Sequence, residues 1–510
     1  MTSPQAGRAG AATREPGATG ASRLVVGPFN RVEGDLEVRL TVADGRVEHA
    51  KVVASMYRGF EPMLAGRDPR DALVIVPRIC GICSVSQSVA AARALAGLGG
   101  QSAPPNGVHA INLMLACENL ADHLTHFYVF FMPDFAREAY RGRVWFETVS
   151  DRFTALAGRH ARAALAARQR WFTMLGTLGG RWPHTHSVQP GGSSRAIDGS
   201  ERVRLLARVR EFRAFLEDTL FGAPLEEVAA LSSLAALDAW HSRDAGRGDL
   251  RLFLGITGDL GLAALGEGPG RYLSHGAFHG PDGRPALAQG WLDLAHRGER
   301  PVAQPVPFDR LSEDATHAWL VGDASDARHP REGQTVPVPD KAGAYTWNKA
   351  PRLAGQVVET GALARQLVAG NPLIGEFVAE RGRGVAARVL ARLHELAIVT
   401  LWAESWLQAI RPGEPFHVPA ELPAHGQAAG LAEAARGALG HWVTVRDGRI
   451  ANYQIVSPTS WNFSPRDGAG APGALEQALA GAPVLPGEAS PMAVQHIVRS
   501  FDPCMVCTVH

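Results

Sequence analysis

The chain has 510 residues, 46% of which are hydrophobic, so it can bury a large core. Its 51 basic residues nearly balance its 50 acidic residues, and the formal net charge of +1 provides no global field for attracting nucleic acid or an anionic membrane. The sequence also has no run of about 18 apolar residues, the length that spans a bilayer. We therefore expect neither nucleic-acid binding nor direct insertion into a membrane.

The first 22 residues differ in composition from the rest of the chain. They are rich in Ala, Gly, Thr and Ser and contain no apolar cluster that could offset the entropy of ordering them. We expect residues 1–22 to be a disordered tail. No change in composition divides residues 23–510, so we expect this part to form a single large domain.

The predicted elements change in type along the chain. Alternating apolar residues predict strands over 24–53 with a two-residue turn at Asp44-Gly45, and a second hairpin at 441–445 and 450–456 around Asp447-Gly448. Apolar residues at helical spacing predict long helices over 107–131, 152–175, 201–221 and 385–410. Residues 265–345 are rich in Gly, Pro and Asp and predict loops with short strands. The expected fold class is α+β, mainly α, with a bundle of long helices and small peripheral sheets.

Four of the five cysteines lie in two CxxC pairs, one near each end of the chain. The pairs are Cys80 with Cys83 and Cys504 with Cys507. Thiols at positions i and i+3 can bind one ion together, and two pairs supply four sulfur ligands for zinc, iron or nickel. The fifth, Cys117, lies in an apolar helix and is expected to be a small buried side chain.

Two simpler interpretations of these pairs are a structural zinc site and a redox-active dithiol. Zinc ribbons usually place their pairs about 15–20 residues apart, whereas Cys83 and Cys504 are 421 residues apart. A thioredoxin-type site needs only one pair at the start of a helix and would leave the other pair unexplained. The separation favours a site that joins the two ends of a large fold.

The motifs around both pairs resemble those of the large subunit of nickel-iron hydrogenases. RICGIC contains the first pair and DPCMVCTVH, at the end of the chain, contains the second. Further blocks agree with the family in the same order, from residue 24 to 510: RVEG, RGFE, GRDP, ADHLTHFY, KAPR, RGALGHW and PTSWNFSPRD. The resemblance implies the long-helix fold of that family.

The resemblance also implies a nickel-iron centre whose iron carries carbon monoxide and cyanide. Cys80 and Cys504 match the terminal nickel ligands, and Cys83 and Cys507 match the thiolates that bridge nickel and iron. Maturation factors must insert the diatomic ligands, because these are not protein atoms. Since only Cys117 remains after the four ligands, we expect no iron-sulfur cluster in this chain.

Several polar residues match positions around that centre. Arg436 corresponds to the guanidinium that lies over the metals, and Asp122 and Asp502 correspond to the carboxylates that pair with it. Thr459 corresponds to a position that contacts a cyanide. These matches imply a buried charged group next to the metals.

A proton relay and a magnesium site are implied in the same way. Glu33 matches the proton gate near the terminal cysteine of the second pair, where burial must raise the pKa of the carboxyl so that it can accept and pass on a proton. Glu61, the carbonyl of Val456 and the ring of His510 match a magnesium site, which is suited to oxygen ligands.

Two features differ from many hydrogen-consuming members. Gln87 stands where many carry His, and Ala435 precedes Arg436 where many carry Pro. A glutamine cannot change its charge near neutral pH. The CGICSVSQS string is similar to the cytoplasmic hydrogen-sensing branch, and the sequence ends at His510, where most members are made with a removable extension. We take both features to favour a sensor.

Three hypotheses for the function follow. The first is a regulatory hydrogenase in the cytoplasm that cleaves hydrogen slowly and signals to a histidine kinase. The second is a hydrogen-uptake enzyme that feeds electrons to respiration. The third is a metal-free or zinc-bound structural relative, which the complete set of four cysteines disfavours. The first two require an iron-sulfur small subunit as partner, in a heterodimer or a dimer of heterodimers.

Overall fold

The computed structural model describes residues 14–16, 22–295 and 302–508. Within these residues, the first eight α-helices are α1 Phe60–Leu64, α2 Ala72–Ile75, α3 Ser84–Gly99, α4 Pro105–Thr125, α5 Phe146–Phe153, α6 Arg159–Gly179, α7 Gly199–Phe215 and α8 Leu225–Ala229. The later helices are α9 Leu234–Arg243, α10 Asp249–Leu260, α11 Ala362–Val368, α12 Pro372–Arg381, α13 Val385–Ala409, α14 Pro458–Asn462, α15 Ala474–Leu479 and α16 Met492–Ser500. In the described part of the chain, no helix is long and apolar enough to cross a membrane.

The strands form small antiparallel sheets. The N-terminal sheet has the order β1 Arg14–Pro16, β2 Ser22–Val26, β3 Leu36–Ala43 and β4 Arg46–Ala54. A three-stranded sheet contains β11 Gly426–Ala434, β12 Gly437–Arg446 and β13 Arg449–Val456. The remaining pairs are β5 Val188–Gln189 with β6 Gly192–Ser193, β7 Arg271–His279 with β8 Pro285–Asp293, and β9 Leu311–Asp314 with β10 Ala350–Leu353.

Both predicted hairpins are confirmed. Asp44 and Gly45 connect β3 to β4 and have φ angles of 50° and 70°. Asp447 and Gly448 connect β12 to β13 with φ angles of 51° and 71°. Two successive residues with positive φ give the turn whose twist matches that of antiparallel strands.

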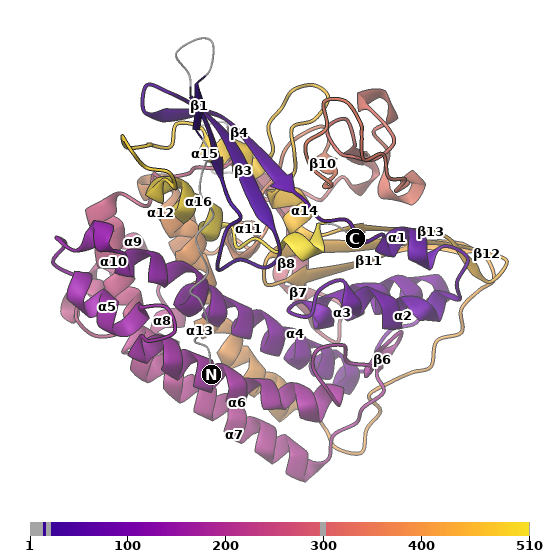
Figure 1. Cartoon of the computed structure of the whole chain (residues 1–510). Helices are drawn as coiled ribbons and strands as arrows, with labels where there is room; N and C mark the ends of the chain where they lie inside the picture. Colours follow the sequence, from indigo (N-terminus) through magenta and orange to yellow (C-terminus); the bar gives the residue numbers. More distant parts are fainter. Residues whose placement is uncertain (1–13, 17–21, 296–301, 509–510) are drawn as a thin grey trace, which may run out of the picture.

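The long helices form the bundle in the lower part of Figure 1, where α4 packs between α13 and α6, and α7 covers α6. Helix α4 is buried without interruption from Asn112 to Leu124, as expected for a helix enclosed on all sides. Helix α7 buries only the stripe Leu205, Val209 and Phe212, because its other faces meet solvent. The fold class is therefore α+β with helices predominating.

Three details differ from the predicted elements. The segment 152–175 is not one helix: α5 ends at Phe153 and α6 begins at Arg159, because Leu156 adopts a φ of 64° and Gly158 is extended. The segments 107–131 and 201–221 each end in a π-helical turn, at His126–Phe131 and Leu216–Phe221.

The N-terminal segment and residues 265–345 also depart in part. Strand β1 and Ser22, the first residue of β2, lie inside the predicted disordered tail, and β1 pairs with β2. Residues 1–13 and 17–21 of that tail lie outside the described residues. Residues 265–345 contain loops and the short β9 as expected. They also contain β7 and β8, whose nine residues each exceed the short strands predicted.

Segments from the N-terminal and C-terminal parts of the chain pack against each other. Arg46 at the start of β4 forms an isolated bridge with Pro483, and β4 packs on α15. Helix α3 packs on β11 and β12, and the segment after α16 contacts α14. One continuous apolar core includes Leu24 in β2 and Cys507 near the C-terminus. This arrangement brings the two cysteine motifs together.

Candidate metal centre

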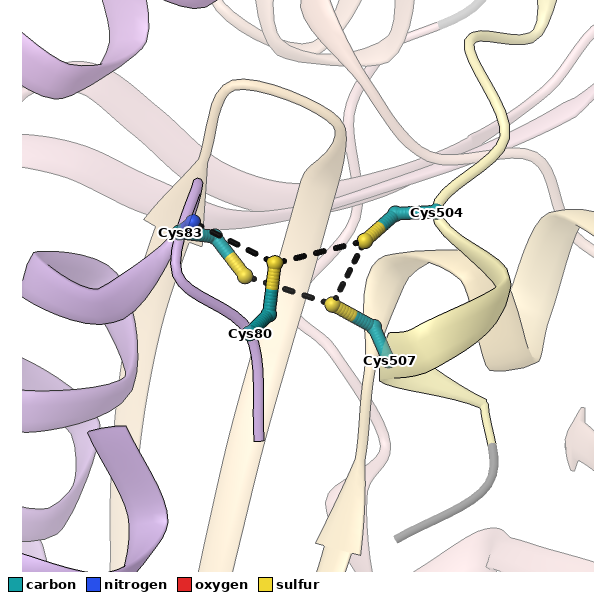
Figure 2. Close-up of side chains that lie close together, drawn as sticks. All are labelled: Cys80, Cys83, Cys504 and Cys507. Carbon is teal, nitrogen blue, oxygen red and sulfur yellow. Dashed lines mark hydrogen bonds between the residues drawn. The ribbon is translucent and has the colours of Figure 1, made fainter. Parts of the chain in front are cut away.

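The two cysteine pairs converge on one buried cluster (Figure 2). The four Sγ atoms all lie within 4.8 Å of one another. Cys80 Sγ is 3.5 Å from Cys504 Sγ, and Cys83 Sγ is 3.2 Å from Cys507 Sγ. The sulfurs of Cys504 and Cys507 are 2.9 Å apart, and none of the four cysteines forms a disulfide. The predicted four-sulfur site is therefore preformed in the fold.

Backbone structure fixes the four thiols from two sides. Cys83 is the residue immediately before α3, and its N–H donates to Cys80 Sγ at 3.4 Å. Cys504 pairs with Glu33 in a parallel bridge, and the N–H of Met505 donates to the carbonyl of Glu33 at 2.7 Å. The second pair is thus held against an N-terminal segment by main-chain hydrogen bonds.

The cluster shares protons unequally among its sulfurs. Hydrogen bonds from Cys504, Cys507 and Cys83 hold the pKa of Cys80 well below its usual range, and the positive charge of Arg436 acts in the same direction. Hydrogen bonds with Cys504 and Cys80 raise the pKa of both Cys83 and Cys507 well above that range. A soft cation would displace the remaining protons, because thiolate is the form that ligates metals. The donor set therefore fits nickel, iron or zinc.

Arg436 lies beside this cluster in a buried charged group. It follows the end of β11 and contacts Asp122 through Nη1 at 3.0 Å. Its Nε donates to the carbonyl of Asp502 at 3.0 Å, and Nη2 contacts the carboxylate of Asp502 at 3.2 Å. The structure therefore brings together the three residues that the sequence predicted to pair.

The guanidinium of Arg436 contacts both carboxyl groups, and this affects the pKa of all three residues. Burial acts against the charge of Arg436, but Asp122 and Asp502 hold its pKa well above the usual range. Burial raises the pKa of Asp122 to about 8. Burial also acts against ionisation of Asp502, yet Arg436 brings the pKa of that carboxyl below its ordinary value. Asp502 is the ionised partner, and the group as a whole is close to neutral.

Glu33 is half-buried, its backbone pairs with Cys504, and its carboxyl is close enough to Cys80 and Arg436 to be affected by their charges. Burial raises the pKa of its carboxyl, the negative charge of Cys80 raises it further, and Arg436 lowers it. A carboxyl with a raised pKa next to a thiol can exchange protons with it near neutral pH. The structure therefore places Glu33 beside the second cysteine pair, and its role as a proton gate remains a prediction.

Thr459 and Gln87 also lie against the cluster. The hydroxyl of Thr459 accepts a hydrogen bond from the N–H of Cys504 at 3.3 Å. Gln87 lies one helical turn after Cys83, and its N–H donates to the carbonyl of Cys83 at 3.1 Å. Its side-chain oxygen is 2.8 Å from Nε2 of His441. Thr459 therefore contacts the second cysteine motif, and Gln87 contacts the first.

The predicted magnesium ligands are partly brought together. Glu61 is buried and accepts from the N–H of Ile455 at 2.7 Å, so it adjoins β13, which ends at Val456. Glu61, Glu313, Lys349 and Thr508 line one small cavity. His510 lies outside the described residues.

Comparison with known proteins identifies the family. The sequence profile described as nickel-dependent hydrogenase matches residues 58–141 and 258–510. The chain belongs to the nickel-dependent hydrogenase family. It is 30% identical to the periplasmic [NiFeSe] hydrogenase large subunit of Desulfomicrobium baculatum over 97% of this chain and 96% of that one.

Two further comparisons agree. The chain is 26% identical to the uptake hydrogenase large subunit of Bradyrhizobium diazoefficiens, over 96% of this chain and 95% of that one. The solved Ni-Fe-Se hydrogenase of D. vulgaris Hildenborough in the reduced state superposes with a TM-score of 0.82 and 30% identity, covering 96% of this chain and all of that one. The chain is therefore a hydrogenase large subunit and an oxidoreductase.

Sequence reasoning missed several residues that support this hydrogenase site. The guanidinium of Arg58 donates to the carbonyls of Ile79 and Val506, which joins the two cysteine motifs directly. His441 contacts the hydroxyl of Tyr453 at 2.8 Å in addition to Gln87. Arg58 and His441 lie inside the motifs RGFE and RGALGHW, so the motifs themselves were the available signal.

Glu118 is another supporting residue that no motif marked. It lies on α4 and accepts from the N–H groups of Val85 and Ser86, at 2.7 and 2.9 Å, in the first turn of α3. Burial raises its pKa to about 7, against the effect of these hydrogen bonds. The carboxyl binds the free N–H groups of the helix that begins after Cys83.

Proposed function

We propose that this chain carries a nickel-iron centre on its four clustered thiols and cleaves hydrogen heterolytically there. One observation carries the proposal: four buried cysteines that form no disulfide have their sulfur atoms within 4.8 Å of one another, in a member of this family. Cys80 and Cys504 would be the terminal nickel ligands, with Cys83 and Cys507 as the bridges. When bound, the metals supply the Lewis-acid and redox chemistry that polarises and splits hydrogen.

The protein's own groups then handle charge and protons. Arg436 presents a fixed positive charge beside Cys80 and Cys504, and two carboxylates hold its planar fork in place. Glu33 accepts a proton from the neighbouring thiol and passes it away from the cluster, because its raised pKa keeps it close to balance with a thiol. The site separates these two tasks between two side chains.

The iron's carbon monoxide and cyanide ligands belong to the same proposal. Arg436 and the hydroxyl of Thr459 are the hydrogen-bonding groups next to the sulfur cluster that suit a cyanide. Maturation factors would insert these ligands before the C-terminal segment closes. The main-chain bonds between Glu33 and residues 503–505 are the closure that would follow.

We also propose magnesium at the cavity beside Glu61. Glu61 and Glu313 are buried carboxyl groups on this cavity, and Lys349 lies 3.7 Å from Glu61 and 3.4 Å from Glu313. Carboxylate and carbonyl oxygens are suitable ligands for a hard divalent cation. Glu61, the carbonyl of Val456 and the ring of His510 would hold it.

Electrons must leave through another chain in this scheme. After the four thiols of the cluster, only Cys117 remains, and it is buried with its thiol 3.5 Å from the carbonyl of Trp171. One cysteine cannot hold an iron-sulfur cluster. An iron-sulfur small subunit is therefore the proposed partner, in a heterodimer or a dimer of heterodimers.

The finer role that we propose is a cytoplasmic hydrogen sensor that signals to a histidine kinase. Its support is Gln87, whose amide cannot titrate and which is paired with His441 instead of offering a second imidazole beside Cys83. Respiratory hydrogen uptake is the second candidate, and the likeness to the uptake hydrogenase large subunit favours it. A sensor should turn over hydrogen slowly and change the autophosphorylation of a co-purified kinase; fast turnover without a kinase would favour uptake.

The activity itself is tested by cysteine variants. Cys80→Ser and Cys507→Ser should abolish hydrogen-dependent dye reduction, because each removes a ligand thiolate. Cys117→Ser is the matched control, since this buried cysteine lies outside the cluster and a hydroxyl can keep its hydrogen bond to Trp171. Full activity in either ligand variant would contradict the proposal.

A further inference from the structure

A cleft separate from the cysteine cluster lies against the middle and the C-terminal part of α3, away from Cys83 at the start of this helix. It has a volume of about 470 Å³ and is bounded by α3, α4, the β5–β6 turn and the end of β7. This volume is in the range of small-molecule sites, roughly 300–1,000 Å³. Most of the walls are apolar, with side chains such as Val89, Ala96, Val108 and Ile111.

Arg93 is the cation that lines this cleft, and its side chain is partly buried. One Nη donates to the carbonyl of Leu431 at 2.6 Å, and the other is 3.1 Å from Nδ1 of His279. A guanidinium has five N–H donors in a planar fork, so these two contacts leave donors for another acceptor. Both partners are uncharged, because burial lowers the pKa of His279 to about 4.

The counter-charge that such a group needs does not come from the described part of this chain. Burial lowers the pKa of Arg93 to about 10, so it remains a cation at neutral pH. Among the described residues, no carboxylate forms an ion pair with it. Asp282 lines the mouth of the cleft, but its carboxylate accepts from the N–H of Arg284 and lies 4.0 Å from that guanidinium. A charge that is partly withdrawn from water favours a partner of opposite charge, and this cleft leaves room for one.

We propose that this cleft binds a small organic carboxylate with an apolar body, held by the guanidinium of Arg93. A carboxylate matches the fork of an arginine and would supply the missing negative charge. The apolar walls formed by α3 and α4 would cover the rest of the ligand. The site lies outside the cysteine cluster and does not depend on the metals.

Titration calorimetry on the matured protein, with any partner chain attached, tests the proposal. Hexanoate is the probe and hexanol is its uncharged analogue. Hexanoate should bind saturably, and Arg93→Gln should weaken its Kd at least about tenfold, the loss expected for a charged hydrogen bond. Arg284→Gln, at the exposed hairpin tip, is the matched control and should bind as the wild type does.

Ala96→Phe is a second variant that keeps the arginine and fills the cleft. It should abolish hexanoate binding while leaving the fold and the metal content unchanged. Equal affinity for hexanol, or unchanged affinity in both Arg93→Gln and Ala96→Phe, would overturn the proposal. Binding by the separated chain but not by the complex would show that a partner's carboxylate occupies the cleft, and would overturn the small-molecule assignment.

Discussion

The two flanks of the cysteine cluster are built on opposite principles. The charged flank contains Arg436, Asp122 and Asp502, buried together beside Cys80 and Cys504. The second flank, here called the polar flank, contains Gln87, His441 and Tyr453, linked by two contacts of 2.8 Å beyond Cys83. In a low dielectric, a fixed charge strongly changes the energy of an adjacent thiolate. The hydrogen bonds of the polar flank mainly orient the side chains that form them. The rate of hydrogen activation should therefore depend on the charged flank, and the stability of the fold on the polar flank.

Among the residues around the four cysteines, the largest effect is expected at Glu33, which borders the charged flank. Glu33→Gln should leave the metals and hydrogen binding intact but slow proton exchange with water by about 10²–10⁴, because an amide cannot relay a proton. Mass spectrometry of isotope exchange between D₂ and water measures this. Glu37→Gln, a nearby carboxylate paired with Arg39 at the surface, is the control. Equal exchange rates in the Glu33 variant would remove Glu33 from the pathway.

Arg436→Lys should have the next largest effect. An ammonium keeps the charge but lacks the planar fork that Asp122 and Asp502 hold, so hydrogen activation should slow by about 10²-fold with nickel retained. The control is Arg352→Lys, which alters a buried ion pair with Asp467 elsewhere in the fold. If isotope exchange is unchanged in Arg436→Lys, Arg436 has only a structural role.

The next prediction concerns Glu118, whose titration should make the stability of the protein depend on pH. Burial raises the pKa of Glu118 in the fold to about 7 from its ordinary value of 4.5, so the contribution of this carboxyl to stability is complete below pH 4.5 and is lost as pH rises through 7. The loss amounts to about 3 kcal/mol across this range. Glu118→Gln should flatten the fall of Tm between pH 5 and 8. A profile parallel to that of the wild type would show that the carboxyl does not titrate there.

The smallest effect is expected at Gln87. Gln87→Leu leaves Nε2 of His441 buried without this acceptor, which should cost about 1–3 kcal/mol of stability. Nickel content and the rate per nickel should change little, in contrast to the charged flank. Gln87→His retains a nitrogen that can pair with His441 and should lose less. A rate defect in Gln87→Leu as large as that of Arg436→Lys would end the distinction between the flanks.

The cluster was predictable from sequence because its chemistry is concentrated in short motifs. Two CxxC pairs indicate a four-thiol site whatever their separation, and Asp-Gly turns indicate hairpins through local backbone preference. Arg436, Asp122 and Asp502 were assigned only through resemblance, since no local pattern reveals that residues so far apart share one buried charge.

Other features depend on tertiary contacts and could not be predicted. Arg58 joins Ile79 to Val506, and Glu118 binds the start of α3 across two helices. The break between α5 and α6 was hidden because apolar residues keep helical spacing across Leu156 and Gly158. Strand β1 forms because β2 offers it a partner, which the composition of the segment does not show.

The metal content of the matured protein tests the central claim most directly. Elemental analysis should find one nickel and one iron per chain, and Cys80→Ser or Cys507→Ser should remove the nickel while Cys117→Ser retains it. Stoichiometric zinc without nickel in protein that still oxidises hydrogen would contradict the assignment of the four thiols to a nickel-iron centre.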